Sequence, residues 1–85
     1  MYLHLGGEKI IRSKELIGIF DLSVEKSSKL FKEFITYYKE NNLITAISDE
    51  EPKSLVITEN NLYYSPVSPA TLRKRVNHGW ALFNS

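Results

Sequence analysis

The segment SLVITENNLYYS, residues 54–65, carries the pattern that decides the fold. Ser54 to Thr58 is rich in β-branched residues, which predicts a strand. The two asparagines that follow predict a turn, and Leu62 to Ser65 predicts the return strand. Neighbouring strand residues point to opposite faces, so one of Tyr63 and Tyr64 is expected to pack inward. The segment is expected to form a β-hairpin.

A helix is expected directly after this hairpin. Ser68 and Pro69 fit the N-cap and the first helical position, and apolar residues continue along one face to about His78. Gly79 fits the position just beyond the helix end. We expect one domain over residues 1–78 and a short apolar tail over residues 79–85, which contains Trp80, Leu82 and Phe83.

Another helix is expected upstream, from about Val24 to Glu40. Asp21 and Ser23 are N-cap types, and Asn41 with Asn42 would stop the helix. Its apolar face is expected to contain Leu30, Phe31, Phe34, Ile35 and Tyr38. The last four of these are expected to be buried against Leu16, Ile17 and Ile19. Full burial of Phe34 would make Phe34→Ala cost about 3–5 kcal/mol.

The N-terminal part has strand periodicity. Tyr2 to Leu5 alternates polar and apolar residues, and Gly6 with Gly7 predicts a turn that leads into a second strand, residues 9–12. The nearly continuous apolar run Leu16 to Phe20 predicts a strand buried on both faces, in the centre of a sheet. A further strand is expected over Leu43 to Ile47, before a polar loop.

These elements predict an α+β fold with two β-β-α-like units, an antiparallel sheet sandwich and two helices. The two units follow from a comparison of residues 11–16 with residues 57–62, which share a strand, turn, strand plan.

The composition is that of an ordinary globular domain. The 85 residues carry a formal net charge of +1, and 42% are hydrophobic. A chain this short has a small core, so self-association is expected. The lack of cysteine excludes disulfides, a thiolate zinc site and a Cys nucleophile, and it fits a cytoplasmic location. No signal peptide, membrane span or membrane partner is expected.

No constellation indicates an enzyme, a metal site or a cofactor. His4 and His78 lack companions at ligand spacing. The glycines at positions 6 and 7 lie in an expected hairpin rather than before a helix, so they do not predict a phosphate loop. Glu50 and Glu51 fit a solvated turn better than an acid and base pair.

The basic residues give the candidate nucleic-acid contacts. Arg12 and Lys14 flank the turn at residues 13–15, and Lys53 follows an acidic loop. Three more cations crowd the last helix, where three consecutive positions spread over about 200°, so a solvated helix face is the alternative. The candidate residues are Lys14, Lys53, Arg12, Arg73, Lys74 and Arg75.

Nearly the whole chain, to about Val76, resembles the RemB branch of the Rem family of small bacterial regulators of extracellular matrix and biofilm genes. The resemblance is carried by MYLHLG at residues 1–6, LIGIFD at residues 16–21, PKSLVIT at residues 52–58 and YYSP at residues 63–66. Ser68, Thr71, Leu72, Lys74 and Arg75 complete it.

The resemblance implies a cytoplasmic regulator of transcription. In the RemA branch it implies a ring-like homo-oligomer that binds double-stranded DNA through arginines on loops. Here the paired loop arginines fall on Glu50 and Glu51, and the basic residue of the first hairpin falls on Glu15. Carboxylates repel phosphates, so only Lys14 and Lys53 are expected to act near those loops.

Two hypotheses therefore follow. The first is a ring-like, DNA-binding homo-oligomer in which weak phosphate contacts are repeated around the assembly. The second is a protein-interaction regulator that binds no DNA and acts beside a RemA-type partner. A DNA mobility shift that depends on salt would separate them.

Overall fold

The structure is a computed structural model that describes the backbone of residues 1–84 and the side chains of residues 1–77. Among the described residues, no helix is long and apolar enough to cross a membrane. The elements in chain order are β1 Tyr2–Gly6, β2 Lys9–Arg12, the 3₁₀ turn η1 Ser13–Glu15, β3 Leu16–Asp21, α1 Val24–Ser27, α2 Lys29–Glu40, β4 Ile44–Ala46, β5 Ser54–Thr58, β6 Leu62–Ser65 and α3 Pro69–Asn84.

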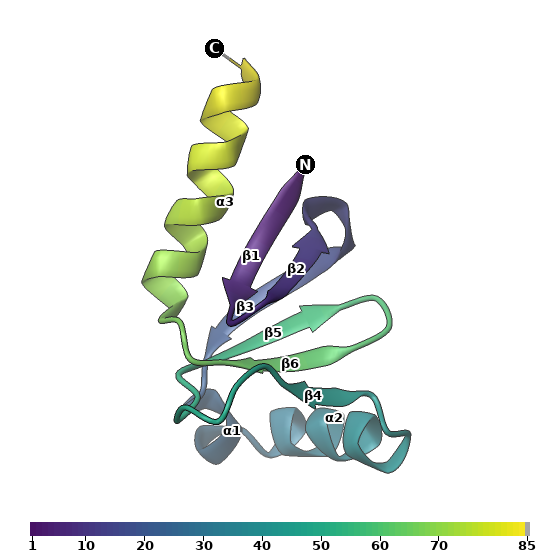
Figure 1. Cartoon of the computed structure of the whole chain (residues 1–85). Coiled ribbons are helices and arrows are strands. Elements are labelled where there is room, and N and C mark those ends of the chain that lie inside the picture. Colours follow the sequence, from purple (N-terminus) through teal and green to yellow (C-terminus); the bar gives the residue numbers. More distant parts are fainter. Residues whose placement is uncertain (85) are drawn as a thin grey trace.

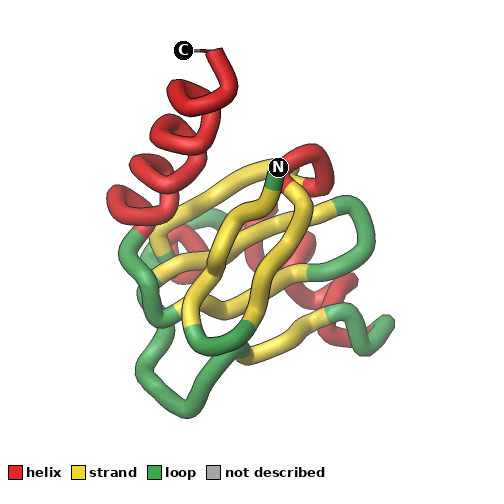
Figure 2. Tube along the Cα trace, turned by 45° about the horizontal axis from the view of Figure 1, so that its top comes forward, coloured by secondary structure: helices red, strands yellow, loops and turns green. Residues whose placement is uncertain are grey.

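The strands form two sheets, and the expected α+β class is confirmed. β1 and β2 make a two-stranded sheet, and the second sheet has the strand order β3-β5-β6-β4. The four-stranded sheet has α2 on one face, and β1, β2 and α3 on the other (Figures 1 and 2). The molecule is therefore layered around this sheet.

The hairpin over residues 54–65 is confirmed. β5 and β6 pair antiparallel from Ser54 opposite Ser65 to Ile57 opposite Leu62, and every residue of β5 is buried. The two tyrosines of β6 enter different cores, because Tyr63 packs with the β1 and β2 side and Tyr64 with the α2 side. β5 and β6 are the central strands of the larger sheet.

The position of β3 differs from the expectation. It pairs only with β5 and lies at an edge of the sheet, so the prediction of a central strand was wrong. Ile17 in its middle is 63% exposed. The apolar run is half-buried because Leu16 and Ile19 contact one core and Phe20 contacts the other.

The two proposed β-β-α units are not equivalent. β2 pairs with β1, whereas β3 pairs with β5, so the two strands on either side of η1 belong to different sheets. β4 pairs in parallel with β6, which makes the larger sheet mixed rather than wholly antiparallel.

The expected helix from Val24 to Glu40 is interrupted. Ser28 has extended backbone angles and ends α1, and its hydroxyl oxygen accepts a hydrogen bond from the Phe31 amide at 3.1 Å to cap α2. Asn42, with a φ of 56°, follows the end of α2 in the left-handed conformation that asparagine tolerates. The expected stop is confirmed.

The buried face of α2 was predicted in part. Ile35 and Tyr38 are buried and Phe31 is half-buried, but Phe34 is 41% exposed and Leu30 is 77% exposed. This face packs on Leu55, Ile57 and Leu62 of the central strands rather than on the expected residues of β3, because that side of β3 presents Phe20. The contact predicted with Leu16, Ile17 and Ile19 was wrong.

Two buried serines of the central strands bind β1 and the segment that leads to α3. The Ser65 hydroxyl donates to the Leu5 carbonyl at 2.5 Å, and the Ser54 hydroxyl donates to the Val67 carbonyl at 2.6 Å. These bonds fix β1 and the connection to α3 against the apolar cluster, whose buried members are Leu3, Leu5, Ile11, Val56, Tyr63 and Leu72.

The last helix begins where expected but extends further. The Ser68 hydroxyl accepts from the Thr71 amide at 3.2 Å, which confirms the cap. α3 continues to Asn84, so the predicted end near His78 with Gly79 as the following residue was wrong. The side chains of the expected apolar tail lie outside the described residues.

Candidate functional site

Arg12 and Lys14 lie together at one end of the molecule. With Met1 and Tyr2 they line a surface hollow of about 260 Å³. The Ser13 amide between them donates to the Met1 carbonyl at 3.0 Å, which fixes the turn against the N-terminus. The two cations are therefore held beside each other on a defined backbone.

An exposed aromatic ring, that of Tyr2, lies next to these cations on the outer face of β1 and β2. Tyr2 lies opposite Arg12 and His4 opposite Ile10 in the strand register, and all four are exposed. Tyr2 is 69% exposed and was not among the predicted site residues. The alternation that predicted buried Leu3 also places Tyr2 outside, so the signal was present in the sequence.

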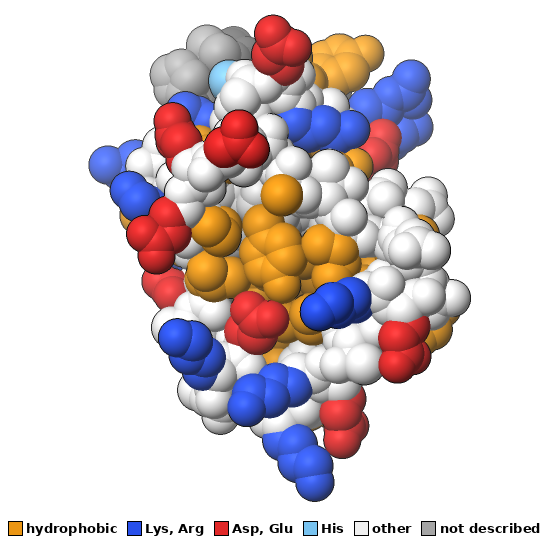
Figure 3. Space-filling view, turned by 60° about the horizontal axis from the view of Figure 1, so that its bottom comes forward, with side chains coloured by type: hydrophobic (Ala, Val, Ile, Leu, Met, Phe, Trp, Pro, Cys, Tyr) orange, Lys and Arg blue, Asp and Glu red, His pale blue; other side chains and the backbone are white. Residues whose placement is uncertain are grey.

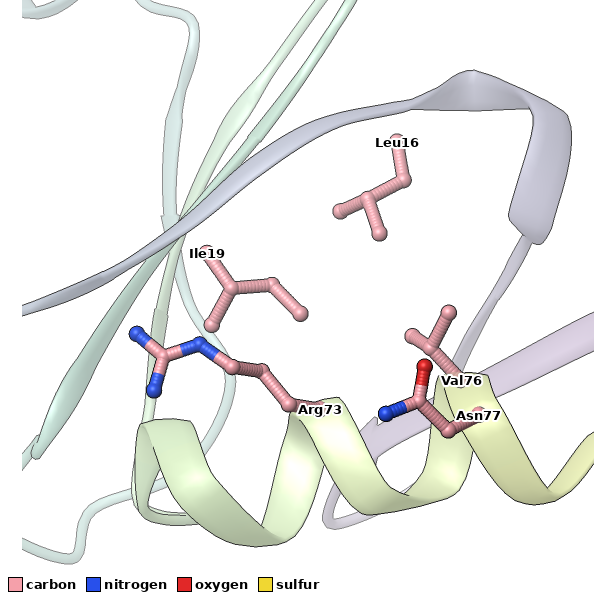
Figure 4. Close-up of a pocket in the computed structure, with 5 residues that line it drawn as sticks. All are labelled: Leu16, Ile19, Arg73, Val76 and Asn77. Atoms are coloured by element: carbon pink, nitrogen blue, oxygen red, sulfur yellow. The ribbon is translucent and has the colours of Figure 1, made fainter.

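The three basic residues of α3 point apart, as their spacing predicts. The Arg75 guanidinium donates to the His4 carbonyl at 2.9 Å, on the side of β1. Arg73 lies on the other side, where it lines a hollow of about 220 Å³ with Ile19 of β3 (Figure 4). Lys74 is exposed between them, and the three do not form one binding stripe.

Arg73 lies within electrostatic reach of Asp21. The pKa of Asp21 is lowered mainly because its carboxylate accepts the Ser23 amide at 2.9 Å, and the charge of Arg73 lowers it further.

Lys53 is not close to Lys14. Lys14 precedes the start of β3, which pairs with the end of β5, and Lys53 precedes the start of β5. The two lysines therefore lie at opposite ends of the pair, about 20 Å apart for a six-residue strand. Lys53 instead lies next to Leu22, whose amide donates to the Lys53 carbonyl at 3.1 Å.

The acidic loop lies at the Lys53 end. It connects β4 to β5, and its residues Glu50 and Glu51 are exposed. The Glu50 amide donates to the Ser48 hydroxyl at 3.2 Å in a local turn. Glu15 lies in η1 at the other end, next to Lys14. The described residues hold no group of three or more metal-ligating side chains.

The comparisons with known proteins agree on one family. A family model described as RemA-like, extracellular matrix regulatory protein A-like, matches residues 2–76. The chain is also similar to extracellular matrix regulatory protein B of Bacillus subtilis (strain 168), with 37% identity over 75 residues. That alignment covers 88% of this chain and 89% of the relative.

Proposed function

Because this chain belongs to the RemA-like family of extracellular matrix regulatory proteins, we propose that it regulates the expression of matrix genes. In this proposal it acts in the cytoplasm, as a homo-oligomer that binds double-stranded DNA mainly through phosphates. The family match supports the regulatory role over nearly the whole chain.

The pair of Arg12 and Lys14 beside Tyr2 carries the proposal of DNA binding. Two cations that line one hollow can contact neighbouring phosphates without reading a base. The exposed Tyr2 ring provides an apolar surface next to them for a sugar or a base. Few contacts per subunit make binding weak, and repetition in an oligomer raises the overall affinity.

Of the acidic residues near the loops, only Glu15 lies close enough to Arg12 and Lys14 to weaken phosphate binding there. Glu50 and Glu51 lie at the other end of the β3 and β5 pair, so they do not oppose Arg12 and Lys14 within one subunit. Glu15 follows Lys14 directly in η1 and repels a phosphate there. Affinity per subunit is therefore limited mainly by Glu15.

A second candidate function is regulation through a protein partner, without DNA. The outer face of β1 and β2 favours it, because Ile10 is 55% exposed and lies beside Tyr2 and His4. An exposed aliphatic residue suits a protein interface better than a phosphate backbone. A RemA-type regulator is the partner that this alternative names.

A mobility shift with duplex DNA over a range of salt concentrations tests the choice. The chain should shift DNA at low salt, and Arg12→Ala with Lys14→Ala should abolish the shift. The matched control is Lys53→Ala with Arg73→Ala, which removes the same charge at the opposite end. An equal loss in both double variants would reject this DNA surface. No shift by the unmodified chain would reject DNA binding and favour the protein partner.

A further inference from the structure

The β3 edge of the four-stranded sheet is open. In the described part of the chain, β3 is hydrogen-bonded to β5 alone. The Leu22 amide, just after β3, donates to the Lys53 carbonyl at 3.1 Å, so Leu22 faces β5. Backbone groups alternate in direction along an antiparallel strand. The N–H and C=O groups of Ile19 and Asp21 therefore point away from β5, where another strand can bond to them.

A hollow of about 220 Å³ lies beside this edge on the α3 side of the sheet. Leu16 and Ile19 of β3 and Val76 of α3 form its apolar lining, and Arg73 and Asn77 complete it (Figure 4). Residues that lie opposite each other on neighbouring strands point to the same face. The residue of an added strand opposite Ile19 would therefore direct its side chain toward this hollow.

Apolar side chains also flank the edge on the α2 side of the sheet. Phe20 of β3 contacts Phe31 with ring centres 5.0 Å apart, and Phe31 contacts the exposed Phe34 at 6.2 Å. Leu30, which is also exposed, lies one helical turn before Phe34. Figure 3 shows an apolar area on this side of the molecule, bordered by charged side chains of both signs. The open edge therefore has apolar surface on both faces.

We propose that β3 binds an extended segment of a partner protein as an added edge strand of this sheet. Backbone hydrogen bonds to Ile19 and Asp21 would hold the segment, and the surfaces on the two faces would select its alternate side chains. The segment carries an aliphatic and an acidic residue on its α3 side and apolar residues on its α2 side. This surface is distinct from the outer face of β1 and β2, and the inference does not depend on DNA binding.

The acidic residue is required by the charge beside the hollow. Arg73 is exposed and lines the hollow together with Ile19. A guanidinium group can bind a carboxylate through two parallel hydrogen bonds. An acid opposite Ile19 lies within reach of Arg73, and an aliphatic residue two positions away lies near Leu16 and Val76.

Charge complementarity favours a different protein over a second copy as the occupant. β4, the other edge of the same sheet, has three residues, and none of them is acidic. β1 and β2 also contain no acidic residue. Pairing of β3 with a second β3 would bring two Arg73 charges to the same face of the joined sheet. The strands of this chain therefore do not supply the carboxylate that Arg73 would bind.

The test titrates the full ¹⁵N-labelled chain with a synthetic peptide, acetyl-Thr-Leu-Val-Phe-Glu-Leu-Thr-amide. Val and Glu lie on one side of this peptide when it is extended, and Leu, Phe and Leu lie on the other. Hydrogen exchange is followed by nuclear magnetic resonance. In the free chain the amides of Ile19 and Asp21 should exchange faster than that of Phe20, which faces β5. Bound peptide should protect both of them.

The contact with Arg73 is tested by exchanging charges. Arg73→Glu should weaken binding of this peptide about tenfold, as expected for the loss of one hydrogen-bonded charge. A second peptide, with Lys in place of Glu, should bind Arg73→Glu more tightly than it binds the unmodified chain. The matched control is Lys74→Glu, which makes the same charge change at the next, exposed position of α3, outside the hollow. It should leave the affinity for the first peptide unchanged.

Three results would overturn the proposal. The first is a lack of peptide binding at millimolar concentration, and the second is an equal loss of affinity in Arg73→Glu and Lys74→Glu. The third is protection of the Ile19 and Asp21 amides in the chain without peptide, increasing with protein concentration, because a second copy would then cover the edge. The DNA mobility shift is a separate measurement that none of these results decides.

Discussion

The Tyr64 hydroxyl on β6 donates a hydrogen bond to the Glu25 carboxylate on α1 across 3.3 Å. The bond joins the short helix to the sheet, and α1 has no buried residue of its own. We expect Tyr64→Phe to lower the free energy of unfolding by about 1 kcal/mol in urea denaturation. Tyr37→Phe is the control, because Tyr37 is 60% exposed and should change the stability little.

The same contact predicts a loss of stability at alkaline pH. Burial raises the pKa of Tyr64, and the charge of Glu25 raises it further. A raised pKa in the folded state means that the stabilisation is complete below the unfolded tyrosine pKa of about 10. The stabilisation is lost as the pH rises through the folded value. Urea midpoints measured from pH 8 upward should therefore fall less in Tyr64→Phe than in the unmodified chain.

Truncation to alanine should lower the free energy of unfolding more at Leu72 than at Phe34. Leu72 is fully buried and packs α3 against the core on the β1 and β2 side of the sheet, so Leu72→Ala should cost about 2–5 kcal/mol. Phe34 is 41% exposed, so Phe34→Ala should cost less than about 2 kcal/mol, below the cost expected for a fully buried ring. The measurement is chemical denaturation at a concentration where the chain is monomeric. If both variants lost the same free energy of unfolding, the orientation of α2 described here would be contradicted.

The Ser28 cap decides where α2 begins. Its hydroxyl accepts the Phe31 amide, so Ser28→Ala should lower the free energy of unfolding by about 1 kcal/mol. Ser27 is the matched control, because its hydroxyl donates only to the Val24 carbonyl at 3.3 Å on the surface. An unchanged denaturation midpoint in Ser28→Ala would show that the Ser28 hydroxyl does not stabilise the start of α2.

Arginines in the acidic loop should strengthen DNA binding. Glu50→Arg with Glu51→Arg creates a second cationic contact, at the end of the subunit away from Arg12 and Lys14, so the mobility shift should persist to higher salt. Every additional phosphate that the loop neutralises should steepen the salt dependence by about one. Glu8→Arg with Glu59→Arg makes the same charge change elsewhere. An equal increase in affinity in that control would mean that net charge alone acts, without a contact from the loop.

The sequence predicted the helices and strands themselves better than it predicted which strands pair with each other. Period-two alternation was enough for β1, and β-branched residues around the asparagine turn were enough for β5 and β6. The apolar run Leu16 to Phe20 misled the assignment of β3, because an edge strand with a residue for each core is as apolar as a central one. The break at Ser28 was missed because two N-cap residues upstream already explained a helix start.

The candidate site was predicted as a set of charges, without their arrangement. Arg12 and Lys14 are close in the sequence and share a hollow in the structure. Lys53 was grouped with Lys14 through the resemblance, but the pairing of β3 with β5 separates them. That pairing joins residues far apart in the chain, and neither charge nor periodicity in one sequence reports it.

The pairing of β3 with β5 also constrains how the chain can fold during synthesis. β1 and β2 can pair as soon as residue 12 leaves the ribosome, but β3 has no partner until β5 has emerged. The run Leu16 to Phe20 must therefore wait, unpaired, while about forty further residues are added. The complete four-stranded sheet can form only after β6 has emerged, so a slow or truncated synthesis would expose the most apolar strand of the N-terminal half to aggregation.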